Sequence, residues 1–243
     1  MTGRHSDDVH VPDDPGVHRR PDHPQEGVED RVLRDRVAEL LEGPVPLPIV
    51  QAGDPVLRRR AAPYRGQLGS RTLGRLVEAM RVTMLEAPGV GLAAPQVGVG
   101  LALAVIEDPG ALDPELAVAR ERVPVPFRVV LNPEYTPVGP ERVSFYEGCL
   151  SVAGWQAVRS RWRAVRLTGI DERLSPLDEL LSGWPARIVQ HETDHLAGEL
   201  YLDGAELRSL LAPGEAWRHA GEIGPERAAR ELGFRLDGLS EEV

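Results

Sequence analysis

The pattern HETDH at residues 191–195 is the feature that most constrains what this chain can form. On a helix its two histidines lie about one turn apart, so both imidazoles can reach one metal ion. Trp184 and Ile188 precede His191 at helical spacing, so the histidine face continues an apolar stripe. Two histidines on a solvated face are the simpler alternative, but buried imidazoles need a polar partner, and a metal is the usual one. We therefore predict a buried, metal-binding helix over residues 184–196.

The class of metal site depends on a third ligand. A metzincin would have a histidine six residues after His195, but that position is Tyr201, so this class is excluded. Cys149 is the single cysteine and lies in the sequence EGCLS at residues 147–151. A lone cysteine is often only a small buried hydrophobe. As a thiolate it would instead complete a Cys-His-His set with an open fourth position, which is typical of catalytic sites.

A glycine-rich stretch, GVGLAAPQ at residues 89–96, is the third unusual feature. Small residues let the backbone approach a ligand closely, and the amide of Gln96 can donate a hydrogen bond to an oxyanion. The stretch lacks the third glycine of a dinucleotide-binding fingerprint and the lysine of a P-loop. A tight turn is the alternative interpretation.

Composition limits the partners. The 243 residues carry 38 acidic against 28 basic side chains, and the formal charge of −10 argues against a nucleic-acid partner or a polybasic membrane anchor. No apolar run approaches the roughly 18–20 residues that span a bilayer, and the first residues do not resemble a secretory signal. We expect a cytoplasmic protein that binds neither nucleic acid in its own right nor a membrane. All basic residues are arginine, which excludes lysine chemistry.

The chain divides into four parts by composition and pattern. The first part is acidic and rich in proline, so we expect it to be disordered. A short amphipathic helix that ends at Gly43 leads into the catalytic part. A charged extension follows, and from about Pro213 we expect little packing against the rest. The predicted parts are a tail over residues 1–30, a lead-in helix over 31–43, a catalytic domain over 44–210 and an extension over 211–243.

Hydrophobic periodicity predicts an α+β fold. A core-facing helix is expected over residues 72–87, in addition to the helix over 184–196. Strands are interleaved with these helices without a regular βαβ repeat, which argues against a doubly wound sheet. The predicted strands cover residues 101–106, 128–131, 141–145 and 164–169.

Taken together, the three motifs resemble those of the peptide deformylases. That family carries a GφGφAAxQ loop (φ, apolar), then EGCLS, then QHExDH, and this chain has residues 89–96, 147–151 and 190–195 in that order. The resemblance covers roughly residues 48–205. It implies a peptide-deformylase-like fold, with antiparallel or mixed strands packed around the central helix. It also implies hydrolysis of the formyl group from the N-terminal formylmethionine of newly synthesised polypeptides, with release of formate.

The resemblance also implies a role for individual residues. Glu192 would be the general acid and base, and the Gln96 side chain and the Leu150 backbone N–H would stabilise charge on the formyl oxygen. Gly91 and Gly148 would pair with the peptide backbone, as an added strand does. The implied metal ligands are Cys149, His191 and His195, and we assign the methionine pocket, as a hypothesis, to Val90, Trp184 and Ile188. Trp184, where the family commonly has leucine, is equally well explained as a core residue.

The metal ion and the partners follow from the same comparison. One thiolate and two imidazoles suit Zn(II), Fe(II), Ni(II) or Co(II), and the resemblance favours Fe(II). The expected partners are N-formylmethionyl nascent peptides and, transiently, the ribosome. Glu147 and Arg161 resemble a buried pair that braces the cysteine strand, with an ordinary surface salt bridge as the alternative.

Two other functions compete with deformylation. A zinc peptidase of the His-Glu-x-x-His kind would cleave internal amide bonds and would not depend on a formyl group. A catalytically idle relative would only bind nascent chains or the ribosome, although an acidic chain is poorly suited to bind ribosomal RNA.

Overall fold

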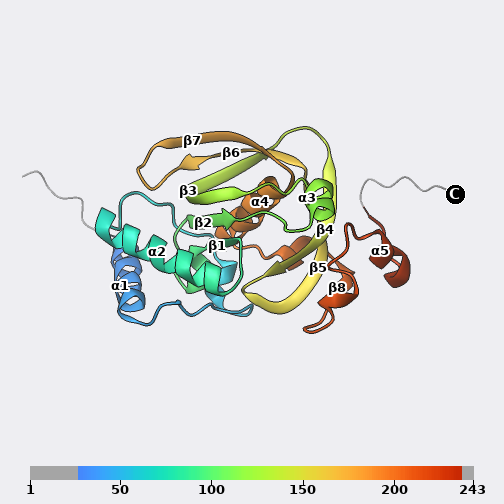
Figure 1. Ribbon diagram of the computed structural model, residues 1–243. Coiled ribbons are helices and arrows are strands. Elements are labelled where there is room, and N and C mark those ends of the chain that lie inside the picture. Colours follow the sequence, from blue (N-terminus) through green and yellow to red (C-terminus); the bar gives the residue numbers. More distant parts are fainter. Residues whose placement is uncertain (1–26, 237–243) are drawn as a thin grey trace, which may run out of the picture.

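The computed structural model describes residues 27–236 (Figure 1). Most of the tail predicted for residues 1–30 lies outside the described residues. Residues 28–30 are an exception, because they belong to helix α1, Val28–Glu42, which begins three residues earlier than the predicted lead-in helix. Gly27 precedes its first turn, and Gly43 follows its last turn, as predicted.

Two antiparallel sheets form the framework. In the larger sheet the strand order is β1-β2-β3-β6-β7, and in the smaller sheet it is β4-β5-β8. The larger sheet consists of β1 (Gly91–Ala93), β2 (Leu103–Asp108), β3 (Val125–Pro137), β6 (Ala164–Ile170) and β7 (Pro176–Ser182). The smaller sheet consists of β4 (Arg142–Cys149), β5 (Val152–Trp162) and β8 (Ala205–Leu211).

Helix α4, Gly183–Ala197, lies between the two sheets (Figure 1). It contacts strands of the larger sheet and also β5 of the smaller one. Helix α2, Ser70–Glu86, packs its apolar face, including Leu76 and Met80, against β1 and β2, and α1 packs against α2. The remaining helices are short: α3 (Pro114–Ala119) and α5 (Glu226–Leu232).

The predicted fold class is confirmed, since helices and antiparallel sheets occur without a βαβ unit. Each of the four predicted strands is present, but the strand expected over residues 141–145 continues to Cys149, because its pairing with β5 extends to the cysteine itself. Four strands were missed: β1, β5, β7 and β8. In these strands apolar and polar residues alternate only weakly, or charged residues interrupt the pattern. Their pairing therefore depends on partners that are distant in the sequence rather than on a local pattern.

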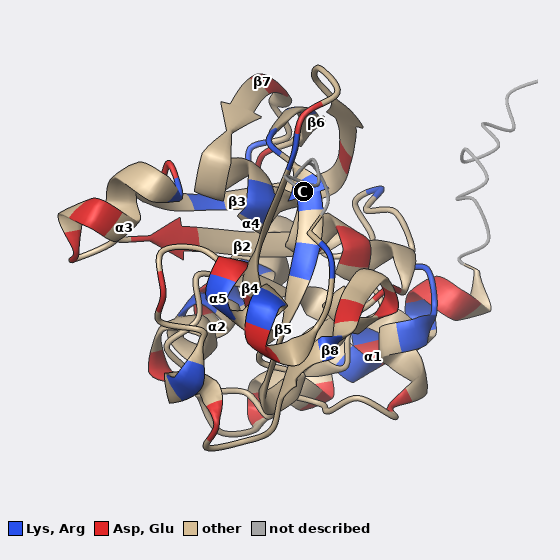
Figure 2. Cartoon of the chain, turned by 90° about the vertical axis from the view of Figure 1, so that its right-hand side faces the viewer, with Lys and Arg blue, Asp and Glu red and all other residues tan. Residues whose placement is uncertain are grey.

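The C-terminal segment packs against the smaller sheet, contrary to the expectation of little contact after Pro213. Ala228 of α5 and Phe234 are buried in one cluster with Tyr146 and Leu211. The segment carries charges of both signs, as α5 shows in Figure 2. Its few apolar residues are spaced too widely to suggest a core face. None of the helices within residues 27–236 is long and apolar enough to cross a membrane.

Gly198 ends α4 and packs closely against the backbone of Arg58. It has a φ of 87° and its N–H caps the carbonyls of Asp194 and His195. A Cβ atom there would lie 2.9 Å from the backbone carbon of Arg58. Gly214 has nearly the same φ, 86°, but has open space around it.

We expect Gly198→Ala to lower the free energy of unfolding by about 2–5 kcal/mol, because left-handed strain and a backbone clash add together. Gly214→Ala, the matched control, should cost only about 1–2 kcal/mol, since it adds the strain alone. Denaturant unfolding of both variants measures the difference. Equal losses would show that the contact between Gly198 and the Arg58 backbone is unimportant.

Candidate active site

Helix α4 holds the HETDH pattern in the interior of the protein, because the helix is buried on almost every side. Pro185 is tolerated in its first turn, and Gly198 ends it in the left-handed conformation. His195 is 1% exposed and Glu192 is 4% exposed. The predicted helix over residues 184–196 is therefore confirmed to within one residue at each end, and its histidines lie in the interior.

Cys149, His191 and His195 meet at one point. The ligand atoms that they offer all lie within 4.8 Å of one another, and within residues 27–236 this is a Cys/His/Asp/Glu group compact enough to hold a metal ion. The Cys149 Sγ lies 3.2 Å from His195 Nε2, and the two imidazole centroids are 5.0 Å apart. A thiolate with two imidazoles is a donor set for Fe(II), Zn(II) or Ni(II). The predicted residues therefore fit a metal chemically and spatially.

The end of β4 brings the cysteine to the helix. The pairing of β4 with β5 changes register between Gly148 and Cys149, which breaks the regular alternation of the strand at this point. Gln96, in the short helix Ala94–Val97, donates from Nε2 to the Cys149 Sγ at 3.5 Å. Its other amide atom, Oε1, accepts from the Ala93 N–H at 2.8 Å, which fixes the orientation of the side chain.

Glu192 occupies space that a side chain at residue 91 would need. A Cβ atom on Gly91 would lie 2.3 Å from Glu192 Oε1. The second oxygen, Oε2, is buried and has no hydrogen-bond partner. Burial raises the pKa of Glu192 to about 7, although the positive charges of His191 and Arg161 act in the opposite direction. The carboxyl group is thus held in place with one oxygen free.

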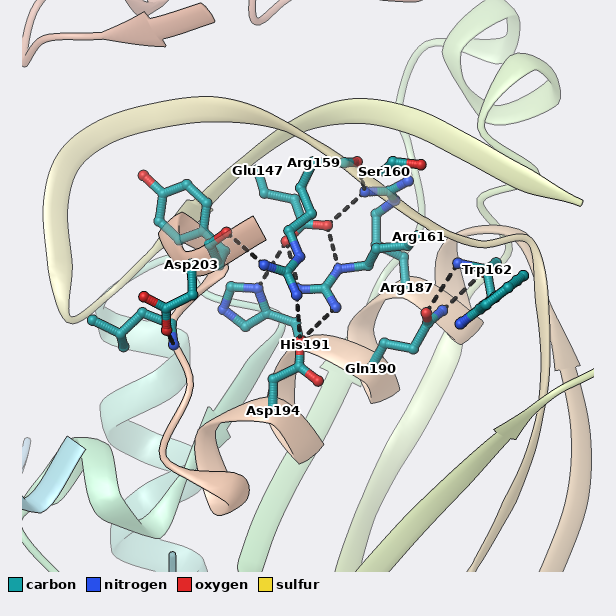
Figure 3. A network of polar contacts seen from close by, with 12 residues as sticks. Glu147, Arg159, Ser160, Arg161, Trp162, Arg187, Gln190, His191, Asp194 and Asp203 are labelled. Carbon is teal, nitrogen blue, oxygen red and sulfur yellow. Dashed lines mark hydrogen bonds and ion pairs between the residues drawn. The ribbon is translucent and has the colours of Figure 1, made fainter. Parts of the chain in front are cut away.

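Glu147 contacts His191 of the ligand cluster and is fully paired. Arg161 donates to it through two hydrogen bonds, Nε to Oε1 at 2.6 Å and Nη2 to Oε2 at 2.9 Å (Figure 3). His191 Nδ1 lies 3.1 Å from Glu147 Oε2, which leaves Nε2 of this ring for the ligand cluster. Arg187 adds a third cation, 2.5 Å from Oε1. Burial alone would raise the pKa of Glu147, but Arg161, His191 and Arg187 hold it well below the ordinary value.

Asp194 extends this network along α4. It accepts from Arg161 Nη1 at 2.8 Å, from Arg159 Nη2 at 3.2 Å and from the Tyr135 hydroxyl at 3.0 Å. Burial, followed by the charge of Asp194, raises the pKa of Tyr135 to about 12. The network thus joins β3, β5 and α4 below the ligand cluster.

The buried pair between Glu147 and Arg161 is confirmed, and the surface salt bridge considered as its alternative is wrong, since the Arg161 side chain is 2% exposed. Arg187 and Asp194 were missed as members of the network. Both lie on α4 within four residues of His191, and their proximity to the motif was the available signal. Gln190 was also missed as an anchor. It bonds the N–H and the carbonyl of Trp162 and so attaches α4 to β5 (Figure 3).

A cavity of about 480 Å³ opens beside the ligand cluster. His195 does not line it and lies behind the cysteine. Every other predicted site residue does: Val90, Gly91, Gln96, Gly148, Cys149, Leu150, Trp184, Ile188, His191 and Glu192. Sequence reasoning missed further lining residues, among them Arg120, Arg122, Tyr146, Trp155, Gln156, Arg187 and Ala220.

Comparison with known proteins agrees with this geometry. The family profile described as "Polypeptide deformylase" matches residues 46–209. Peptide deformylase 3 of Streptomyces avermitilis is 60% identical over 206 residues, which cover 85% of this chain and 92% of that protein. The mitochondrial peptide deformylase of Homo sapiens is 40% identical over 197 residues, which cover 76% of this chain and 81% of that protein.

Solved structures show the same likeness. A class I type b peptide deformylase from Acinetobacter baumannii with bound Met-Ala-Ser has a TM-score of 0.59 at 33% identity, over 65% of this chain and 97% of that chain. A peptide deformylase from Synechococcus elongatus in complex with actinonin has a TM-score of 0.56 at 30% identity, over 82% of this chain and 92% of that chain. The profile match and these identities show that the chain belongs to the peptide deformylase family.

Proposed function

We propose that Cys149, His191 and His195 bind one divalent metal ion beside the general acid and base Glu192. In this arrangement the chain removes the N-terminal formyl group from newly synthesised polypeptides, the reaction of its family. The observation that carries the proposal is the meeting of one sulfur and two imidazole nitrogens within 4.8 Å, next to a buried carboxyl group that lines an open cavity. We assign the catalytic part to residues 44–210, with the remainder as extensions.

The ion that we propose is Fe(II), on the resemblance to the family, and Zn(II) or Ni(II) would suit the same donors. When bound, such an ion supplies Lewis acidity and activation of a water molecule. Glu147 supports the ligand set by holding His191 through Nδ1. Because the chemistry acts on newly made chains, we expect a cytoplasmic location and a transient contact with the ribosome.

Glu192 is the residue that we propose to move the proton. Its Oε2 is buried without a partner, so it can accept a proton from the attacking water and return it to the departing amine. The amine of the first residue then leaves, and the formyl group is released as formate. Because Gly91 has no side chain, it leaves the space that the Glu192 carboxyl group occupies.

Gln96 and Leu150 are proposed to stabilise the negative charge that develops on the formyl oxygen. Both line the cavity next to Cys149, and the Gln96 amide is oriented by the Ala93 N–H. In this role the Gln96 Nε2 and the Leu150 backbone N–H would donate to the oxygen. Loss of one such donor typically lowers the rate roughly 10²–10³-fold.

The peptide is proposed to lie between two strand edges. β1 is an edge strand of the larger sheet and β4 an edge strand of the smaller one, and Gly91 and Gly148 lie on these strands. An extended peptide can pair with such edges through its backbone, independently of its side chains. The methionine side chain would then enter the pocket formed by Val90, Trp184 and Ile188, which pack in one apolar cluster.

Exchange of Glu192 for glutamine tests the proton-transfer role. We expect Glu192→Gln to lower formate release from a formyl-Met peptide roughly 10²–10⁴-fold, because the amide cannot accept the proton. Metal content should remain that of the unaltered protein. Glu199→Gln, an exposed glutamate just after α4, is the matched control and should leave the rate unchanged. A Glu192→Gln variant with normal turnover would contradict the assignment.

Removal of the metal tests the ligand assignment. After treatment with a chelator under anaerobic conditions, we expect formate release to stop and to return on addition of Fe(II), Zn(II) or Ni(II). Cys149→Ser should bind less metal, since an alcohol is a poorer ligand than a thiolate for these ions. Metal content by elemental analysis and formate release together measure the effect. Full activity in the metal-depleted protein would overturn the proposal, as would cleavage of unformylated internal amide bonds.

Exchange of Arg161 tests the support of the metal site. Arg161→Ala leaves Glu147 and Asp194 with fewer cations in the interior, so we expect a loss of about 3–5 kcal/mol in the free energy of unfolding and a lower metal content. Arg166→Ala, the matched control, removes an exposed ion pair with Asp178 and should leave the free energy of unfolding nearly unchanged. If Arg161→Ala matched the unaltered protein in metal content and melting temperature, the supporting role of Arg161 would be refuted.

A further inference from the structure

One end of the cavity is lined by three arginines that surround Trp184. The guanidinium carbons of Arg120, Arg122 and Arg187 lie 5.2, 5.5 and 5.8 Å from the centroid of a Trp184 ring. Phe145 also contacts Trp184, in an edge-to-face arrangement with ring centroids 6.0 Å apart. All three arginines line the same cavity as Cys149 and His191. This part of the cavity is therefore positively charged.

Two of the three cations form ion pairs with carboxylates of the chain. Arg122 donates two hydrogen bonds of 2.9 Å to the buried carboxylate of Asp108. Arg187 pairs with Glu147 at 2.5 Å. Across residues 27–236, no carboxylate forms an ion pair with Arg120.

Arg120 is held by carbonyl groups instead. Its Nη2 donates to the Ala220 carbonyl at 3.3 Å and to the Glu222 carbonyl at 2.6 Å, while its Nε is buried without a hydrogen-bond partner. The carboxylate of Glu222 pairs with Arg227. Burial, followed by the positive charge of Arg122, lowers the pKa of Arg120. The guanidinium is thus fixed beside the cavity, partly desolvated and without an anion.

The segment that fixes Arg120 lies after the part of the chain that the family profile matches, which ends at residue 209. Ala220 lines the cavity and belongs to the segment that packs on Tyr146 through Ala228 and Phe234. The C-terminal segment and the loop after α3 thus form one wall of the cavity.

A formylmethionyl group does not require this cation, because its blocked amine and its thioether are both uncharged. We propose that Arg120 recognises the carboxylate of an aspartate or glutamate at the second or third residue of the formylated polypeptide. The inference rests on the proposed deformylase function and adds a substrate preference to it. A carboxylate and a guanidinium form strong, charge-assisted hydrogen bonds. Arg120 is then a specificity residue that contacts the substrate away from the reacting atoms.

The test compares C-terminally amidated peptides that differ only in the charge of one side chain: formyl-Met-Glu-Ser with formyl-Met-Gln-Ser, and formyl-Met-Ala-Glu with formyl-Met-Ala-Gln. For at least one pair we expect kcat/KM to be roughly tenfold higher with glutamate, mainly through a lower KM. The preference should decrease as salt is raised. Arg120→Gln should abolish it, and Arg120→Lys should retain part of it. Arg71→Gln, an exposed residue of α2, should keep the full preference.

Equal kcat/KM for glutamate and glutamine in both pairs would overturn the inference, and so would an unchanged preference in Arg120→Gln. The glutamine peptides report deformylation itself. Release of formate without a charge preference therefore contradicts only the role of Arg120, whereas release from no peptide contradicts the proposed function and this inference together. If Arg120→Gln does not fold, as its melting temperature would show, the comparison in the unaltered protein and in Arg120→Lys decides the question.

Discussion

The buried contact between Glu147 and Arg161 is the interaction on which the rest of the site depends. Glu147 lies two residues before Cys149 on β4 and accepts from His191, so one carboxylate connects the strand of the thiol to the helix of the imidazoles. Arg161 connects the same carboxylate to Asp194 on α4. Burial of these charges is costly unless each has its partners. The arrangement therefore fixes one relative position of β4, β5 and α4, and with it the distances among the three ligands.

The elements with a strong local pattern were predictable. The helix of the HETDH pattern was expected to within a residue at each end, because its apolar spacing begins at Trp184 and continues through the two histidines. The three residues of the ligand cluster were also expected together, Cys149 through the order of the motifs rather than through any property of a lone cysteine. The burial of Glu147 with Arg161 followed from the same resemblance.

The rest of the site depends on contacts that a periodic pattern does not contain. Helix α4 is enclosed by two sheets, so Arg187 and Asp194 are buried although they lie outside its apolar stripe. Strand β5 carries Arg159 and Arg161, whose charges are tolerated only because distant carboxylates meet them. The C-terminal segment buries only a few apolar residues, and its partners, such as Tyr146, lie about eighty residues earlier in the chain. Such long-range pairings are invisible to local sequence patterns.

The contact between Gly91 and Glu192 fixes the position of β1 relative to α4. Because the carboxyl group fills the volume of the missing side chain, β1 and α4 cannot slide past each other without moving the acid. The strand edge that we propose to pair with the peptide and the carboxyl group that we propose to transfer the proton therefore share one register. Alignment of the substrate backbone and placement of the base become a single adjustment, and small errors in either position are costly to the rate of a reaction that depends on orientation.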